Sequence, residues 1–425
     1  MNTVMQSAAV MRHQDQQANR GPVVDAVRNP GSAGLSEAVC SLLRYCRERD
    51  WAGHDPYDAL NSRVFAATPL SRSRFCRLAL TQTLKRLPIN VRPLLRIPAT
   101  QNPKALGLFL SSLLRLERLG IAGASNDIDR VIERLVQLRS PDTPYWCWGY
   151  SFPWQTRIVL VPCHAPNLVC TTFVSHALLD VYEQRGDTRC RDMAESAARY
   201  LAQELYWTTG NGEAGFSYPV PGTHARIHNA NLLGAALLFR IYSRNKDRGL
   251  RDAALAATRY SVSRQEKDGS WYYGEGANQR WIDNFHTGYN LCALRAINSY
   301  AGSDEFGPSL RRGYEFFQDR FFREDGAPKY FHDRTYPIDI HSVAQSMITL
   351  LTMRDYDKDG MQRAQSLFAW ALQHMRDEQG HFYYQSLPLY RNTISYMRWS
   401  QAWMLLALSA LLEACQQDAA AQSNP

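Results

Sequence analysis

The sequence predicts an all-α protein, a single (α/α)6 barrel or toroid of helical hairpins. A unit of about 55 residues repeats from Pro141 onward, and each unit has a glycine-aromatic loop, a helix with a polar first turn, and a second helix. Few segments alternate with period two, and no run of β-branched residues suggests a sheet. This unit is a helical-hairpin repeat, longer than most helical solenoid repeats.

The glycine-aromatic loops mark where each repeat begins. The last four of their glycines are separated by 54, 57 and 54 residues. The five loops begin at Gly149, Gly215, Gly269, Gly326 and Gly380. A second helix then follows, as in 191–206, 252–264, 308–322 and 362–375.

The first helix of each repeat gives a second, independent measure of the step. Asn231, His286, His341 and Arg398 fall in register, with spacings of 55, 55 and 57 residues. These helices are rich in Ala, Gly and Ser, which permits close packing around a shared axis. The helices between Leu35 and Arg139 supply chain for a sixth hairpin, so we expect six hairpins to close into a ring with the loops at one mouth.

We expect the toroid to span residues 35–415. Residues 1–34 are polar and lack the apolar stretch of a signal peptide, which predicts a disordered tail on a cytoplasmic protein. Residues 416–425 are predicted to be a second disordered tail. The nine cysteines include no Cys-x-x-Cys pair, so the sequence indicates neither a disulfide framework nor a metal site, and no cofactor is expected.

Positive charge is concentrated in one part of the chain. Residues 63–139 hold fourteen Lys or Arg and four acidic residues, whereas the rest is close to neutral. Such a segment could meet an acidic polysaccharide or an anionic membrane surface, and the alternative is a solvated surface. Nucleic acid is not expected, because the arginines are spread through apolar helices and match no binding motif.

The stretch 281–294 carries the densest group of candidate catalytic side chains. Asp283, His286 and Asn290 share one helical face, with Tyr289 beside them. His286 and His341 occupy equivalent positions in successive repeats, and histidine exchanges protons near neutral pH. Asp283 stands three residues before His286, and we expect it to orient that ring; the alternative is a simple helix cap.

The second histidine has the same kind of neighbour. Asp339 lies two residues before His341 and is expected to orient it, and Tyr289 or Tyr336 is an alternative base. A polysaccharide lyase or epimerase needs such a base and a cation or amide at the sugar carboxylate, whereas a glycoside hydrolase needs two carboxylates. For each histidine the alternative is a buried, hydrogen-bonded core residue.

Aromatic and polar residues in the loops are candidates for sugar binding, because aromatic faces suit the C–H faces of sugar rings. The alternative is that the tryptophans cement neighbouring repeats. The candidates are Trp148, Trp154, Gln155, Arg157, Asn229, Trp271, Trp281, Asn284, Asn290, His332, Arg398 and Trp399.

Two resemblances accompany these motifs. The stretch 265–271, Gln-Glu-Lys-Asp-Gly-Ser-Trp, resembles the Gln-x-x-x-Gly-x-Trp repeat of squalene cyclase and prenyltransferase toroids. The chain after the tail resembles the α/α toroid proteins of bacterial exopolysaccharide loci, of six-hairpin glycosidase-like form. The matching stretches are 55–58, 102–109, 148–155 and 283–286.

The second resemblance implies a role in making or processing polysaccharide, without fixing a reaction. Two function classes follow: a carbohydrate-active lyase, hydrolase or epimerase, or a non-catalytic toroid that binds a glycan or a lipid-linked intermediate. A terpene cyclase is a distant third, because the Asp-x-Asp-Asp acid of class II cyclases is absent; the acidic cluster at 355–359 reads as a solvated loop.

Overall fold

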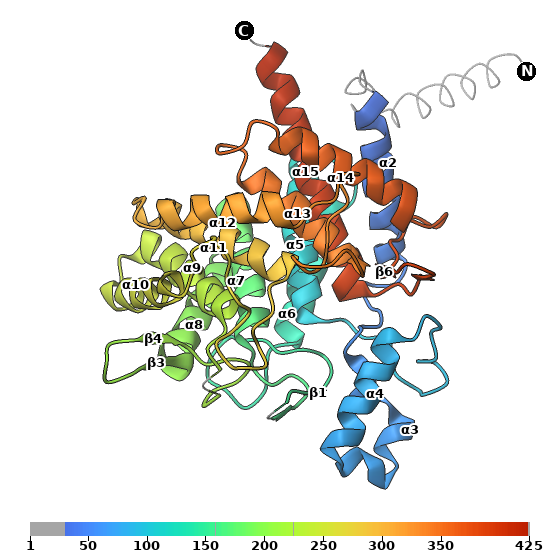
Figure 1. The fold of residues 1–425 in the computed structure, drawn as a ribbon, viewed down its shortest axis with the longest axis horizontal. Coiled ribbons are helices and arrows are strands. Elements are labelled where there is room, and N and C mark those ends of the chain that lie inside the picture. Colours follow the sequence, from blue (N-terminus) through green and yellow to red (C-terminus); the bar gives the residue numbers. More distant parts are fainter. Residues whose placement is uncertain (1–29, 158, 224, 424–425) are drawn as a thin grey trace, which may run out of the picture.

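The structure is a computed structural model that describes residues 30–157, 159–223 and 225–423. Six helices form an inner ring, and each contacts the next, with the last packed on the first (Figure 1). The prediction of an (α/α)6 toroid is confirmed. The inner helices are α5 (Pro103–Arg118), α7 (Leu168–Arg185), α9 (His228–Asn245), α11 (Asn284–Ala301), α13 (Ile340–Thr352) and α15 (Ala402–Ser423).

Six further helices surround this ring, each against one inner helix. Five follow their inner partner along the chain, whereas the sixth pair joins N-terminal α2 to C-terminal α15. The predicted sixth hairpin from residues 35–139 is therefore α5 with α6, and the chain ends supply a separate pair. The outer helices are α2 (Pro30–Arg47), α6 (Ala124–Gln137), α8 (Thr188–Tyr200), α10 (Arg248–Ser263), α12 (Gly307–Arg320) and α14 (Gly360–Met375).

Polar side chains set the starts of several inner helices. Asn102, Asn167, Asp283 and Asp339 are N-cap residues whose side-chain oxygens accept backbone N–H bonds from the first turns of α5, α7, α11 and α13. Such caps satisfy N–H groups that lack a partner within the helix. The polar first turns that mark the repeats are thus the inner-helix ends at the mouth.

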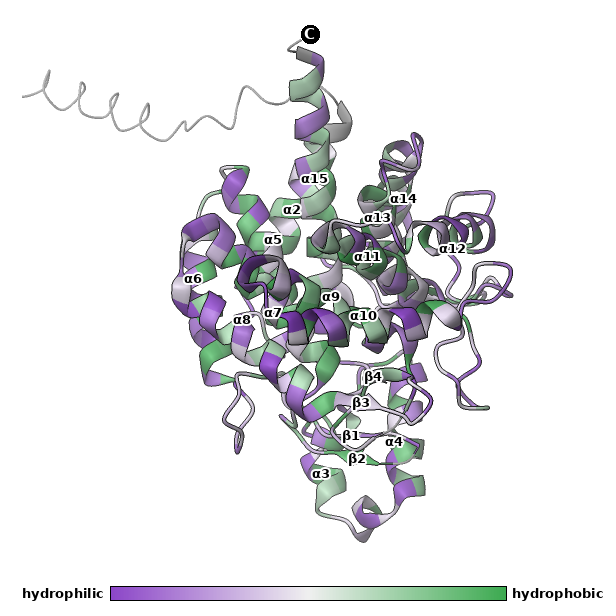
Figure 2. Cartoon of the chain, turned by 90° about the vertical axis from the view of Figure 1, so that its left-hand side faces the viewer, coloured by the Kyte–Doolittle hydropathy of each residue, from purple (hydrophilic) through white to green (hydrophobic). Residues whose placement is uncertain are grey.

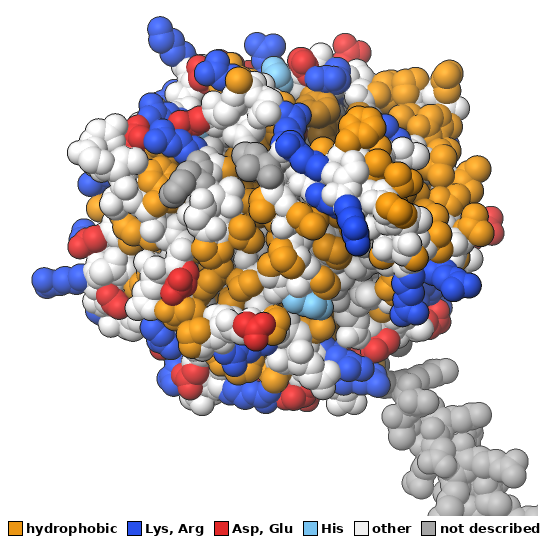
Figure 3. All heavy atoms as spheres, turned by 90° about the horizontal axis from the view of Figure 1, so that it is seen from below, with side chains coloured by type: hydrophobic (Ala, Val, Ile, Leu, Met, Phe, Trp, Pro, Cys, Tyr) orange, Lys and Arg blue, Asp and Glu red, His pale blue; other side chains and the backbone are white. Residues whose placement is uncertain are grey.

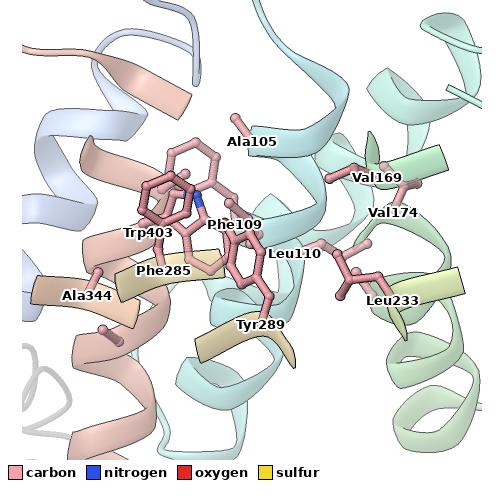
Figure 4. Close-up of a cluster of buried hydrophobic side chains, with 14 of the residues drawn as sticks. Ala105, Phe109, Leu110, Val169, Val174, Leu233, Phe285, Tyr289, Ala344 and Trp403 are labelled. Carbon is pink, nitrogen blue, oxygen red and sulfur yellow. The ribbon is translucent and has the colours of Figure 1, made fainter. Parts of the chain in front are cut away.

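The inner helices are buried around much of their circumference, as a closed ring requires. Side chains from α5, α7, α9, α11, α13 and α15 meet in the core (Figure 4), and the outer helices present more hydrophilic residues outward (Figure 2). Gly107 allows α5 and α7 to approach closely, because a Cβ there would lie 3.1 Å from the backbone of Val174. The small residues of the inner helices therefore permit the tight ring.

The mouth loops contain short strands. Strand β1 (Trp154–Gln155) pairs with β2 (Leu160–Val161), and β3 (Tyr206–Thr208) pairs with β4 (Ala214–Phe216). A third sheet of antiparallel strands has the order β5 (Ile338–Asp339), β6 (Gln385–Ser386), β7 (Arg391–Asn392). Two π-helical turns, η3 (Leu201–Leu205) and η4 (Met397–Gln401), complete the loops.

An insertion of residues 55–98 separates α2 from α5 and projects from the mouth side (Figure 1). It has its own small apolar cluster, which includes Ala59, Leu84 and Ile97. Its helical elements are η1 (Asp58–Asn61), α3 (Arg63–Ala66), η2 (Pro69–Arg72) and α4 (Arg74–Arg86).

Two expectations from the sequence need correction. Helix α15 continues to Ser423, so residues 416–423 are helical where a disordered tail is predicted, and α2 begins at Pro30, inside the predicted N-terminal tail. Residues 1–29 lie outside the described residues.

The basic segment is also not one solvated surface: Arg92 is fully buried and ion-paired with Asp58, and Lys104 is buried at the start of α5. Among the described helices, none combines the length and hydropathy of a membrane span.

Candidate functional site

A cavity of about 310 Å³ opens at the mouth of the toroid. Its wall combines the N-terminal ends of inner helices with the mouth loops and two residues of the insertion, Tyr57 and Lys85. The mouth side faces the viewer in Figure 3, where hydrophobic side chains lie among Lys and Arg side chains. The predicted site residues in the wall are Trp154, Asn229, Trp281, Asp283, His286, Tyr289, His341, Arg398 and Trp399.

Asp283 and His286 form a hydrogen-bonded dyad at the start of α11. Nδ1 of His286 lies 2.7 Å from Oδ2 of Asp283, which also accepts the indole N–H of Trp281 at 3.0 Å. The other carboxylate oxygen accepts the backbone N–H of His286 at 2.9 Å. With Asp283 as acceptor, the ring proton sits on Nδ1, and Nε2 is left with a lone pair that can take a proton.

Tyr289 and His341 form a second pair between α11 and α13. The Tyr289 hydroxyl lies 2.7 Å from Nε2 of His341, and burial raises the pKa of Tyr289 well above 10, so this hydroxyl stays protonated. The predicted role of Tyr289 as a base therefore does not fit its surroundings, and the hydroxyl is a proton donor. Burial, with a smaller contribution from Lys104, lowers the pKa of His341 well below 6.5.

The tautomer of His341 follows from its partners. Nδ1 of His341 is buried and has no hydrogen-bond partner among the described residues. A buried N–H without an acceptor is rarer and more costly than an unpaired acceptor. We therefore place the proton on Nε2, where it donates to the Tyr289 oxygen and leaves the Tyr289 O–H free for a ligand.

Phe285 joins the two pairs in space. Its ring centroid lies 4.2 Å from that of His286 and 4.5 Å from that of His341. The Tyr289 ring is 5.9 Å from each imidazole. The two histidines that the repeat places in register thus lie beside the same cavity, as the sequence predicts.

Asp339 is close to His341 but does not bind its ring. Its Oδ1 accepts the backbone N–H of His341 and the indole N–H of Trp399, both at 2.9 Å, and its Oδ2 accepts Gln385 at 2.7 Å. Burial raises the pKa of Asp339 to about 6. The prediction that Asp339 orients the His341 imidazole is therefore wrong: Asp339 caps the helix and holds Trp399.

Positive side chains also reach the cavity. Arg398 is paired through two bonds, at 2.6 and 2.8 Å, with Asp55, 343 positions earlier in the chain. Lys85 donates to the Tyr57 hydroxyl at 2.6 Å. Lys104 stands among aromatic rings, with Nζ 4.5 Å from the Phe173 centroid, and burial lowers its pKa well below 10.5. A carboxylate ligand would favour the charged form of Lys104.

Aromatic rings make up much of the remaining wall. Tyr273 stacks on Trp281 with centroids 4.5 Å apart, and Trp281 is tied to Asp283. This arrangement offers rigid faces with polar edges, which suits sugar rings. Further aromatic wall residues are Tyr57, Tyr150, Phe152, Tyr218, Tyr330 and Phe331.

Several predicted site residues lie outside this wall. Trp148 and Trp271 are buried, and their indole N–H groups donate to the carbonyls of Leu135 and Ser261, so both cement the scaffold. The others are Asp339, Tyr336, Gln155, Arg157, Asn284, Asn290 and His332.

The surroundings of these residues explain their positions. Tyr336 and Arg157 are exposed, and Arg157 donates to the carbonyl of Asn278. Gln155 accepts from Arg77, and His332 lies 3.3 Å from the carbonyl oxygen of Ile282. These contacts hold loops together, so we do not carry these residues into the proposed site.

The two remaining amides differ. Asn284 is fully buried and accepts from Ser346, which fixes α11 against α13. Asn290 lies with Asn229 along a narrow hollow next to Asp283 and His286. Asn229 and Asn290 each have a buried side-chain oxygen that has no hydrogen-bond partner among the described residues. Asn229, which also lines the larger cavity, is therefore a candidate to accept a hydrogen bond from a ligand, whereas the hollow beside Asn290 has no room for one.

Several wall residues are not site candidates in the sequence, among them Tyr57, Lys85 and Lys104. In the sequence, Lys85 and Lys104 contribute only to the positive charge of residues 63–139. A signal for Lys104 exists, since a lysine in the first turn of an otherwise apolar helix is unusual. Tyr57 lies in the stretch 55–58, which carries the resemblance to exopolysaccharide toroid proteins. No comparable signal marks Lys85, because only the fold of the insertion brings it to the mouth.

The fold has relatives among solved structures, although no known family and no curated protein matches the sequence. A glycoside hydrolase family 76 α-mannanase from Bacteroides thetaiotaomicron has a TM-score of 0.60 at 12% identity, covering 75% of this chain and 88% of its own. An unsaturated glucuronyl hydrolase specific for heparin has a TM-score of 0.58 at 12% identity, covering 91% and 98%.

A third similar structure is the cellobiose 2-epimerase of Spirochaeta thermophila. Its TM-score is 0.54 at 14% identity, covering 74% of this chain and 87% of its own. Identities this low establish the fold alone. This chain therefore has the α/α toroid fold of these carbohydrate-processing enzymes.

Proposed function

We propose that this protein is an enzyme that moves a proton at a carbon next to a carboxylate or carbonyl group of a saccharide. The reaction class is a polysaccharide lyase or an epimerase. The observation that carries the proposal is the Asp283–His286 dyad beside the Tyr289–His341 pair in one aromatic cavity.

His286 is the base in this proposal. Asp283 holds the proton on Nδ1, so Nε2 accepts the proton from the sugar carbon. The imidazolium that forms is stabilised by the Asp283 carboxylate, as in other histidine–carboxylate pairs. The electron pair of the broken C–H bond passes into the adjacent carboxylate or carbonyl.

Tyr289 supplies the acid. Its hydroxyl is protonated and is fixed by Nε2 of His341. In a lyase reaction it gives its proton to the glycosidic oxygen as that C–O bond breaks and a C=C bond forms. In an epimerase reaction it gives its proton to the opposite face of the same carbon. His341 acts through Tyr289 and is a positioning residue.

The charges of the wall support an acidic substrate. Lys85, Lys104 and Arg398 face the cavity, whereas Asp283 is the one carboxylate among its lining residues in the described chain. Lys104 is well suited to a sugar carboxylate, because it is buried and its ion partner would come from the ligand.

Hydrolysis is less well supported by the same observation. A glycoside hydrolase uses two carboxyl groups at the scissile bond. Here Asp283 is committed to His286 and Trp281, and Asp339 lies outside the wall. The mannanase and the glucuronyl hydrolase are therefore guides to the fold, and the epimerase is a structural neighbour whose activity is of the proposed kind.

The resemblance to exopolysaccharide toroid proteins supports a setting in bacterial polysaccharide synthesis. A non-catalytic toroid that binds a glycan or a lipid-linked intermediate is the competing proposal, and the aromatic wall fits it equally well. A terpene cyclase gains no support, because none of the acidic residues at 355–359 lies in the cavity wall.

The test is to incubate the protein with uronate-containing oligosaccharides in heavy water. Deuterium incorporation, measured by mass spectrometry, is expected for an epimerase, and new unsaturated ends are expected for a lyase. H286Q should abolish either signal. H374Q is the matched control, because His374 lies in outer helix α14, where its ring packs against Trp370 with centroids 5.0 Å apart.

New reducing ends without unsaturation would overturn the proton-transfer proposal in favour of hydrolysis. Binding of the oligosaccharides with neither deuterium, unsaturation nor cleavage would leave the glycan-binding proposal.

A further inference from the structure

The insertion has a surface unlike the rest of the molecule. Five of the ten large hydrophobic side chains that are exposed among the described residues lie between residues 64 and 94. The most exposed of these five are Phe75 at 79% and Leu94 at 80%. The five are Val64, Leu70, Phe75, Ile89 and Leu94, which we call the apolar set.

Arginines are interleaved with the apolar set. Residues 59–98 hold eight Lys or Arg and no Asp or Glu. Three of the eight are engaged internally: Arg77 with Gln155, Lys85 with Tyr57, and Arg92 with Asp58. The other five are exposed: Arg63, Arg72, Arg74, Arg86 and Arg96.

This combination is concentrated in the insertion. Elsewhere, exposed arginines such as Arg189 and Arg259 pair with acidic side chains. Figure 3 shows hydrophobic side chains gathered toward the right of the mouth face, on the side where α3 and α4 project in Figure 1. The arginines of the insertion are therefore a local excess of positive charge, and not an even share of the net charge of +8.

From these observations we propose that the insertion docks on an anionic membrane surface. Apolar side chains on short turns enter the interface between headgroups and acyl chains, and the arginines beside them bind lipid phosphates. The absence of acidic residues from 59–98 removes the repulsion that an anionic surface would otherwise cause. A membrane is favoured over a protein partner, because five exposed arginines with no acidic residue in 59–98 suit a surface of uniform negative charge.

The insertion is also attached to the cavity. Lys85 on α4 and Tyr57 line the cavity wall, and Asn392 donates to the carbonyl of Leu87 to hold the end of α4 against the toroid. Docking would therefore hold the mouth near the lipid headgroups. The proposal goes beyond the proposed reaction and does not depend on it.

The test is co-sedimentation of the full chain with vesicles. Wild-type protein should bind phosphatidylcholine vesicles that contain phosphatidylglycerol and should bind pure phosphatidylcholine much less. Binding should weaken as salt rises, because screening shortens the reach of the charges to about 8 Å at physiological strength. The double variant R72E/R74E should weaken binding at least about 30-fold, since each basic residue near the surface contributes about fivefold.

A second variant tests the apolar set without changing charge. F75S/L94S should weaken binding about tenfold or more, because these side chains would no longer enter the interface. Both residues are exposed, so the circular dichroism spectrum should stay that of wild type.

Two matched controls complete the experiment. R130E/R248E removes two exposed arginines outside the insertion, one of them within the basic segment 63–139. L389S removes a leucine that is 96% exposed outside the insertion. Both should bind like wild type.

Equal loss in a control and its insertion variant would overturn the proposal, as would wild-type binding to neither vesicle. Sedimentation of the free protein as a dimer that F75S/L94S converts to a monomer would show that a second copy covers the surface, which also overturns it.

Discussion

The N-terminal ends of α11 and α13 are the same position in successive repeats, yet they carry different chemistry. Each begins with an aspartate cap and places a histidine in the first turn. Asp283 precedes its histidine by three residues and reaches the imidazole, whereas Asp339 precedes its histidine by two and reaches only the backbone N–H. Residues three apart share a helical face, and residues two apart do not.

The surroundings of the rings differ as well. The His286 side chain is 21% exposed at the cavity, whereas His341 is 1% exposed and stacks between Phe285 and Trp403. A change of one residue in the cap spacing thus separates a ring that is free to exchange protons from one fixed in the scaffold. The repeat places a histidine at the start of each helix, and the spacing between the aspartate and the histidine determines whether the aspartate binds the imidazole ring.

The largest expected difference is in turnover. H286Q should lower turnover by about two to four orders of magnitude, because glutamine cannot exchange a proton in this pH range, and its melting temperature should stay near wild type. H341Q should lower turnover less than about tenfold but reduce the free energy of unfolding by about 1–3 kcal/mol, since a stacked, buried ring is lost. Steady-state kinetics and thermal melts of both variants are the measurements. A loss of turnover mainly in H341Q and a loss of stability mainly in H286Q would refute the comparison.

A smaller contrast is expected for the two aspartates. Asparagine keeps the helix cap at either position. D283N should lower turnover about ten- to hundredfold, because it no longer fixes the ring proton of His286 or stabilises the imidazolium. D339N should change turnover less than about threefold. Equal losses in kcat for the two variants would show that Asp339 is as important to the chemistry as Asp283.

The smallest expected effect is on how the free energy of unfolding depends on pH. Burial raises the pKa of Asp339 from 3.8 to about 6, so the folded state binds more protons than the unfolded state between these values. The stability that this group contributes is therefore largest at low pH and falls as pH rises through 6, by about 1 kcal/mol between pH 5 and 7. Urea unfolding of D339N should lack that component, and parallel pH profiles for the wild type and D339N would contradict the assignment.

The sequence is sufficient for the fold and for the centre of the candidate site because both depend on local spacing. The 55-residue step places His286 and His341 on neighbouring helices at one mouth, and the three-residue separation predicts the contact between Asp283 and His286. The equivalent expectation for Asp339 fails, because a residue two positions before His341 does not share its helical face and reaches only its backbone N–H.

The rest of the wall depends on contacts between distant parts of the chain. Asp55 meets Arg398 across 343 positions, and Lys85 reaches the cavity through the fold of the insertion. The spacing of residues along the chain does not predict contacts between residues this far apart. Trp148 could likewise be placed in a loop, but whether its ring faces the cavity or the core depends on the tertiary packing around Leu135.

The pairing of α2 with α15 has a consequence for biosynthesis. Helix α2 emerges early from the ribosome, but its apolar residues, among them Leu35, Val39 and Leu42, gain their partner only when the last helix has been made. The ion pair between Asp55 and Arg398, a residue of the cavity wall, waits for the same event. Until then the nascent chain is an open arc with exposed apolar surface, which is the kind of species that chaperones shield from aggregation.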